Sequence, residues 1–155
     1  MSRERIVTAN EHSTDPTDPA PGAAPRPRTL EQFVGQAQLR ERLAIALSAA
    51  KTRSDSMEHV LLHGPPGLGK TTIAHIVAEE MGTTAFVTSG PALTKGADLV
   101  GTLTRMQPGD VLFIDEIHRL PAAVEEYIYP AMEDFKIDFT LDAGMHARVV
   151  TYQLK

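Results

Sequence analysis

The residues best suited to chemistry stand in one short stretch, GPPGLGKT, at residues 64–71. It fits the pattern G-x-x-x-x-G-K-[ST], in which a glycine-rich loop joins a strand to a helix. Polyphosphate lies there against backbone N–H groups at a helix N-terminus, and side chains at Gly67 or Gly69 would block its approach. Lys70 adds a positive charge for the phosphates, and the Thr71 hydroxyl is a ligand for Mg²⁺. A chance match in a glycine-rich turn is the alternative, and the flanking strand and helix patterns argue against it.

A second motif, VLFIDEIH, ends an apolar run with two acids at residues 111–118. At the carboxyl end of a strand, Asp115 and Glu116 can both turn toward one crevice. In P-loop proteins the first acid holds Mg²⁺, and a second acid beside it can polarise the attacking water as a general base. The alternative is an ordinary turn with exposed acids, which the P-loop in the same chain makes less attractive. His118 completes a D-E-x-H pattern, so γ-phosphate sensing is a further hypothesis.

Composition narrows the function classes. The 155 residues are 42% hydrophobic and 23% charged, as in one ordinary globular domain, and there is no cysteine for a disulfide or a thiolate metal site. The histidines do not cluster in a ligand pattern. A net charge of −5 argues against nucleic-acid binding through bulk charge, and the basic stretch 26–54 and the acidic stretch 110–142 read as two solvated faces. No signal-peptide core or membrane-length apolar run is present, so the cytoplasm is expected.

The elements that must position these residues follow from local patterns. Residues 1–25 are rich in Pro, Thr and Asp and poor in large apolar residues, which predicts a disordered tail. Helical spacing and caps predict helices over 37–53, 69–81, 95–106 and 121–135, and buried strands are expected over 59–64, 83–90 and 110–115. Strands that alternate with helices predict an α/β fold with a parallel sheet.

The last segment, residues 136–154, alternates around a turn at 142–144 and predicts a β-hairpin. On the first strand, one face carries Ile137, Phe139 and Leu141. On the second strand, we expect the same face of the hairpin to carry Val149, Thr151 and Leu154. A two-stranded ribbon cannot bury both faces by itself, so one apolar face is available either to a partner or to the hairpin's own domain.

Five ordered segments resemble the N-terminal ATPase domain of the RuvB family, AAA+ proteins that drive branch migration of Holliday junctions. The similarity covers residues 26–155 and leaves 1–25 unmatched, and it runs through RPRTLEQFVGQ, HVLLHGPPGLGKTT, TSGPAL, GDVLFIDEIHRL and VEEYIYPAMEDF. The resemblance implies a P-loop NTPase fold of AAA+ type, with a parallel sheet flanked by helices and a C-terminal hairpin. Residues 26–155 would then be part of the large ATPase domain.

The resemblance also implies a set of site residues for ATP and Mg²⁺. Catalytic roles would fall to Lys70, Asp115 and Glu116, and metal binding to Thr71 and Asp115. The 33–36 stretch would lie beside the adenine. Nucleotide contacts would come from Arg26, Gly64, Gly67, Gly69, Lys70, Thr71, Thr72, Glu133, Asp134 and Phe135.

For partners, the resemblance implies a RuvA-like junction-binding protein held by the hairpin 136–154, a homo-hexamer, and duplex DNA bound through regions outside this chain. The chain ends at Lys155, before the family's sensor strand, arginine finger, lid and winged-helix domain. In the family's strand order, the next strand would lie between 59–64 and 110–115. We therefore expect these 155 residues alone to be inactive as an ATPase.

Three other functions remain open at this point. A DExH helicase shares the acidic motif but reads adenine through a different segment before the P-loop. A clamp-loader ATPase differs mainly in its partner. A non-catalytic fragment could bind a RuvA-like protein or complete subunits through the hairpin without hydrolysing ATP.

Overall fold

The computed structural model describes residues 26–141 and 148–154. The first half holds two helices, α1 (Ala37–Arg53) and α2 (Lys70–Met81), and strand β1 (Ala85–Ser89). The second half holds η1 (Gly90–Ala92), α3 (Gly96–Leu103), β2 (Val111–Asp115), η2 (Ile117–Arg119), α4 (Ala122–Glu133), β3 (Lys136–Leu141) and β4 (Arg148–Gln153).

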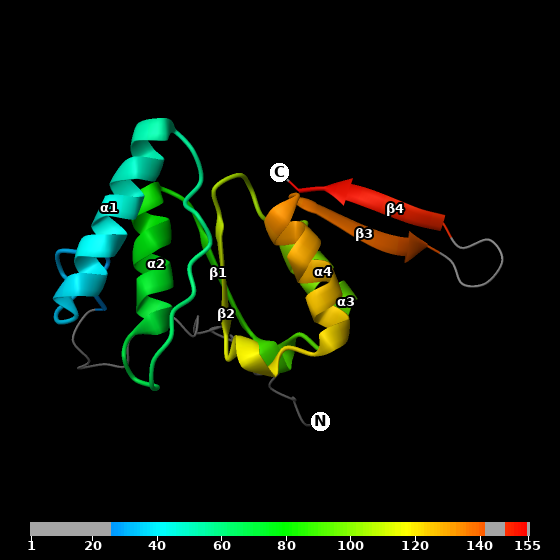
Figure 1. Cartoon of the computed structure of the whole chain (residues 1–155), viewed down its shortest axis with the longest axis horizontal. Helices are drawn as coiled ribbons and strands as arrows, with labels where there is room; N and C mark the ends of the chain where they lie inside the picture. Colours follow the sequence, from blue (N-terminus) through cyan, green and yellow to red (C-terminus); the bar gives the residue numbers. More distant parts are fainter. Residues whose placement is uncertain (1–25, 142–147, 155) are drawn as a thin grey trace, which may run out of the picture.

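Strands β1 and β2 form a parallel pair at the centre of the molecule (Figure 1). The register places Ala85 opposite Val111 and Ser89 opposite Asp115, so both strands end at the same level. Figure 1 shows α1 and α2 on one side of the pair and α3 and α4 on the other. The predicted α/β fold, with a parallel sheet flanked by helices, is confirmed.

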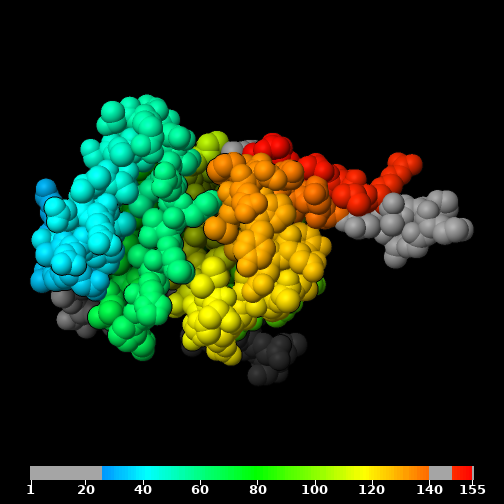
Figure 2. All heavy atoms as spheres, in the orientation of Figure 1, coloured from blue at the N-terminus to red at the C-terminus, as the bar shows by residue number. Residues whose placement is uncertain are grey.

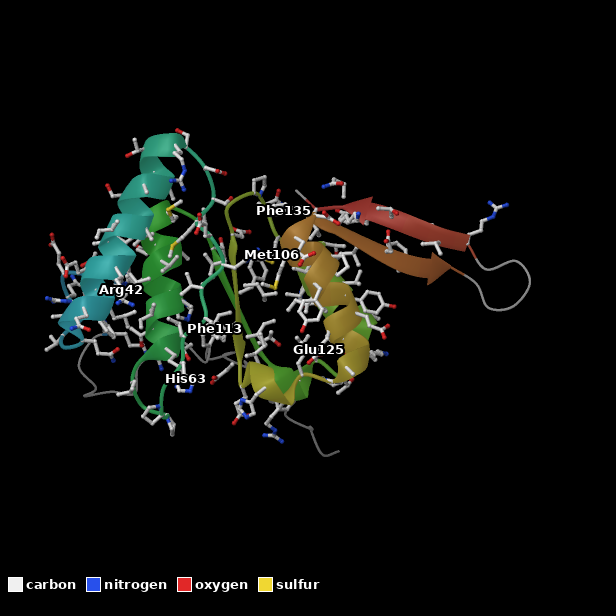
Figure 3. All side chains as sticks on the ribbon, in the orientation of Figure 1. Arg42, His63, Met106, Phe113, Glu125 and Phe135 are labelled. Atoms are coloured by element: carbon white, nitrogen blue, oxygen red, sulfur yellow. The ribbon has the colours of Figure 1, made fainter. Side chains whose placement is uncertain are left out.

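The side chains of β2 explain why its sequence is apolar almost throughout. Val111 packs against the cluster that α1 and α2 build with Phe33, whereas Leu112 and Ile114 pack against the cluster of α3 and α4. Successive residues of a strand point to opposite faces, so a strand covered on both sides needs apolar residues at every position. Phe113 lies between the two helical layers in Figure 3.

The helices follow the sequence pattern closely. Helix α1 has the predicted bounds, and α2 buries Ile73, Ile76 and Val77 on its inner face before it ends at Gly82 in a left-handed cap. Helix α3 stops at Leu103, three residues before the predicted end. Helix α4 lies within the predicted range and contains Pro130.

The predicted strand over 59–64 is wrong. The structure gives these residues no regular secondary structure, and Val60 and Leu61 are 52% and 78% exposed. A strand is stabilised by its hydrogen-bond ladder, and in the described part of the chain β2 pairs with β1 alone. The apolar pattern of 59–64 is that of a strand, but no described neighbour supplies the ladder.

The predicted hairpin is present, although its turn at 142–144 lies outside the described residues. Its register pairs Ile137 with Tyr152 and Phe139 with Val150. We expected Val149 to lie on the same face of the hairpin as Ile137 and Phe139. This was wrong by one residue, because Val150 takes that place and Val149 is 69% exposed. A shift of one residue moves every side chain of a strand to the other face.

The hairpin is attached to the domain at its base. Ile137 is fully buried, and β3 packs against α4. Beyond that contact the ribbon extends away from the body of the molecule, as Figure 2 shows for its red and orange part. Among the described residues, no helix is long and apolar enough to cross a membrane. The predicted tail 1–25 lies outside the described residues.

Candidate nucleotide-binding site

The glycine-rich loop takes the conformation that its composition predicts. Gly67 and Gly69 have φ of 83° and 74°, the left-handed region that other residues enter at a cost. Gly69 is also crowded, because a Cβ there would lie 3.0 Å from the Phe33 ring. At Gly64, where φ is 152°, an added Cβ would likewise lie 3.2 Å from Cδ1 of Leu68. Glycine is therefore required by backbone conformation at 67 and by conformation and space at 69.

Helix α2 begins directly after this loop. Its N-cap is Gly69, and the bond from Ile73 N to Gly69 O, at 2.9 Å, is the first of the helical series. By helix geometry the N–H groups of Lys70, Thr71 and Thr72 point out of the helix start. These donors and the positive end of the helix dipole make the start of α2 suited to an anion.

Lys70 holds its charge inside the loop. Its Nζ donates hydrogen bonds to the carbonyl oxygens of Gly64, at 3.0 Å, and Pro65, at 2.9 Å. The ammonium group thus spans the mouth of the loop that it belongs to. A polyphosphate placed against the loop would meet this charge without a large movement of the side chain.

The 33–36 stretch lies against the loop. Gln36 Nε2 donates to the Leu68 carbonyl at 3.2 Å, Phe33 is buried, and Arg40 Nη1 donates to the Phe33 carbonyl at 3.1 Å. A hollow of about 240 Å³ opens beside them. It is lined by Gln36, Leu39, Leu61, Leu62, His63, Leu68, Lys70 and Ile73. Arg26, the other residue expected near the adenine, is exposed at the start of the described chain.

The two acids leave the sheet at the carboxyl end of β2. Asp115 is half-buried, and its Oδ1 accepts a hydrogen bond from the Glu116 N–H at 2.9 Å. Glu116 has a left-handed backbone with φ of 48°, a conformation that costs a non-glycine residue about 1–3 kcal/mol. Its Oε2 lies 3.0 Å from Nη1 of Arg119 in an exposed ion pair. This ion pair was not predicted from the sequence, although an acid and an arginine three residues apart were a signal for it.

The loop and the acids share one end of the molecule. Helix α2 packs against both strands, and Figure 1 shows that α2 begins and β2 ends at the same lower edge of the view. His63, just before the loop, marks that edge in Figure 3. A glycine-rich loop at a helix start and two carboxylates at the same end of the sheet form an arrangement suited to a nucleoside triphosphate.

Three expected contact residues lie elsewhere. Glu133, Asp134 and Phe135 are at the end of α4, and Figure 3 shows Phe135 at the opposite edge of the molecule from His63. There Asp134 pairs with Lys136 at 2.9 Å, and the Phe135 carbonyl accepts hydrogen bonds from the end of the hairpin. Within a single chain, the structure does not bring this segment together with the loop.

His118 is exposed on η2, next to the acid pair. In the described part of the chain no three His, Asp or Glu side chains gather as a metal site. The two residues expected to bind Mg²⁺, Thr71 and Asp115, both carry oxygen atoms that could serve as ligands, with phosphate oxygens and water to complete the shell. That donor set is typical of Mg²⁺ bound with a nucleotide.

Comparisons with known proteins extend the resemblance. Residues 25–155 match the family described as "Holliday junction DNA helicase RuvB P-loop domain". A Holliday junction branch migration complex subunit RuvB from Desulfosudis oleivorans is 61% identical over 129 residues, which are 83% of this chain and 38% of that protein. The RuvB subunit of Chloroflexus aggregans is 51% identical over 154 residues, 99% of this chain and 43% of that protein. The family match begins at residue 25, in agreement with the expectation that it leaves the first residues unmatched, although the alignment with this one relative covers nearly all of them.

Solved structures agree with the sequence comparisons. The Thermotoga maritima RuvB Holliday junction branch migration motor is 57% identical, with a TM-score of 0.69 over 71% of this chain and 37% of that one. A point mutant of the same protein gives 56% identity and a TM-score of 0.71 over 72% of this chain and 37% of that one. The chain thus spans about two fifths of the length of the proteins that it matches.

Proposed function

Because this chain belongs to the RuvB family over its P-loop domain, we propose that it is the nucleotide-binding part of an ATP-driven motor for branch migration of Holliday junctions. The observation that carries the proposal is the glycine-rich loop with Lys70 at the start of α2, at the sheet edge where β2 ends in Asp115 and Glu116. Residues 26–155 would then form part of the large ATPase domain.

Each group at this edge has a distinct task in the proposed reaction. The loop N–H groups and Lys70 bind and orient the β- and γ-phosphates. Thr71 and Asp115 would hold Mg²⁺, which neutralises charge on the phosphate oxygens when it is bound. The Phe33–Gln36 stretch, anchored on the loop through Gln36, would lie beside the base.

Glu116 is the proposed general base. It would accept a proton from the water that attacks the γ-phosphorus, a role typically worth about 10²–10⁴-fold in rate. In the structure its carboxylate is paired with Arg119, and both side chains are about half exposed, at 49% and 58%. Exposed pairs of this kind contribute about 0–1 kcal/mol, so the pair can open at little cost when a nucleotide binds.

The proposal is tested by ATP hydrolysis on four-way junction DNA, with the chain studied within the protein at its natural length. Glu116→Gln keeps the shape of the side chain but cannot accept the proton. We expect nucleotide affinity close to the parent and turnover at least about 100-fold lower. Glu126→Gln, at an exposed acid on α4, is the matched control and should change neither quantity. Parent-like turnover in Glu116→Gln would remove Glu116 from the mechanism.

The hairpin is the proposed binding surface for a partner protein. Its half-buried face holds Tyr152, opposite the anchor at Ile137, and then Phe139 and Val150 further along a ribbon that extends from the body. We propose that this face binds a RuvA-like junction-binding protein and that the motor assembles as a homo-hexamer around duplex DNA.

A non-catalytic role in which the hairpin only captures that partner is the second candidate. It predicts binding without junction-stimulated hydrolysis. The rate of ATP hydrolysis by the parent protein, with and without junction DNA, therefore distinguishes the two.

A further inference from the structure

The loop that follows β1 packs directly on the backbone of the turn that follows β2. Ser89 and Asp115 are register partners, so the chain leaves both strands at the same level of the sheet. The helix η1 then starts at Gly90, and η2 starts after Glu116. Because the strands are neighbours and end together, the two short helices meet at the edge that holds the acid pair.

Gly90 is the point of closest approach between them. A Cβ at this position would lie 2.6 Å from the Glu116 carbonyl oxygen, 3.0 Å from the Leu120 nitrogen and 3.1 Å from the Arg119 carbonyl carbon. All three are backbone atoms, which cannot turn aside as the end of a long side chain can. Gly90 is buried and lies outside the left-handed region, so glycine is required here by space and not by conformation.

The core prevents the two turns from moving apart. Leu93, just after η1, and Leu120, just after η2, are buried in one cluster with Leu99, Val124 and Ile128. The Leu93 N–H also bonds back to the carbonyl oxygens of Ser89 and Gly90, at 3.3 and 3.2 Å. An added methyl group at position 90 would therefore displace the Glu116 peptide unless this cluster opened.

The Glu116 peptide is held from two directions. Its carbonyl accepts a hydrogen bond from the Arg119 N–H at 2.8 Å on the side of the turn, and Gly90 lies against the same oxygen. Since the backbone of Glu116 is left-handed, with φ of 48°, its side-chain direction depends on this peptide keeping its orientation. A rotation of the peptide would redirect the carboxylate.

We propose that Gly90 is a positioning residue for Glu116, and that the loop after β1 sets the direction of the carboxylate through this backbone contact. The inference rests on the proposed role of Glu116 as general base. It assigns the 90–93 segment a function in turnover and none in nucleotide affinity, because the glycine-rich loop precedes α2, whereas the three atoms nearest an added Cβ at Gly90 all belong to the turn after β2.

The test is Gly90→Ala in the protein at its natural length, with Gly101→Ala as matched control. Gly101 is exposed on α3 with nothing within 4 Å of its added Cβ. A displacement of about 1 Å at a reacting group can cost about 100-fold in rate. We expect kcat of Gly90→Ala to fall about 10- to 100-fold while the dissociation constant of a fluorescent ATP analogue stays within about twofold of the parent. Gly101→Ala should leave both values unchanged.

A double-mutant cycle separates positioning from general damage. If Gly90 acts through Glu116, Gly90→Ala should add no further loss in the Glu116→Gln background, followed with radiolabelled ATP. Parent-like kcat in Gly90→Ala, loss of nucleotide binding together with kcat, or a full additional loss in that background would each overturn the proposal. Failure of the general-base role shows separately, as unchanged turnover in Glu116→Gln alone.

Discussion

Replacement of Lys70 by alanine is the most direct perturbation of the proposed site. The Nζ atom donates to two loop carbonyls, at 3.0 and 2.9 Å, so the charge is already placed at the mouth of the loop. A hydrogen bond that involves a charged group contributes about 1.5–3 kcal/mol. Since each factor of ten corresponds to about 1.4 kcal/mol, the dissociation constant for ATP should rise about 10- to 150-fold. The backbone donors at the start of α2 remain, so some binding survives.

The assay is an anisotropy titration with a fluorescent ATP analogue, together with thermal unfolding of the free protein. Lys51→Ala is the matched control, because it removes the same charge from an exposed ion pair with Glu80, at 2.9 Å. The melting temperature should change little in Lys70→Ala, since both of its bonds end on a partly exposed loop. Parent-like affinity in Lys70→Ala, or an equal loss in Lys51→Ala, would refute the assignment of Lys70 to the phosphates.

Three further predictions concern the rest of the molecule. Ile137→Ala should lower the free energy of unfolding by about 2–5 kcal/mol in urea titrations and leave ATP affinity unchanged, because the side chain is fully buried at the base of the hairpin. Phe139→Asp should weaken capture on an immobilised RuvA-like protein, whereas Val149→Asp, on the exposed face of the ribbon, should not; equal effects would argue against the assigned face. The hydrogen bond from Lys51 lowers the pKa of Glu80, so this pair stabilises the fold above the ordinary value of 4.5 and loses that contribution as the pH falls through the lower folded value. The stability difference between the parent and Lys51→Ala should therefore shrink in acid, and a constant difference would contradict it.

Local patterns in the sequence were sufficient for the helices and for the two motifs. The bounds of α1 follow from apolar spacing, and α2 follows from a glycine-rich start and the stop at Gly82. These signals are local because helical hydrogen bonds join residues about four positions apart. The loop 64–71 could be located for the same reason, because its glycines are required by backbone angles within the loop itself.

What the sequence could not determine depends on residues far apart in the chain. The segment 59–64 has a strand's composition but no described strand to pair with, so only the fold shows that Val60 and Leu61 are exposed. Which residues of β4 lie on the same face as Ile137 and Phe139 depends on the register of the hairpin, and the alternation of the sequence left that register uncertain by one residue.

The requirement for glycine at position 90 belongs to the same class. Its φ is ordinary, and its neighbours in sequence give no reason for the missing side chain. The reason is the Glu116 carbonyl in the turn after β2, which the parallel pairing of β1 and β2 brings against Gly90. The sequence by itself determined where the two motifs lie and which residues are proposed to carry the chemistry, because each motif is local. Only the tertiary structure decided how Glu116 is held, because the atoms that hold it come from separate segments that meet only when the sheet forms.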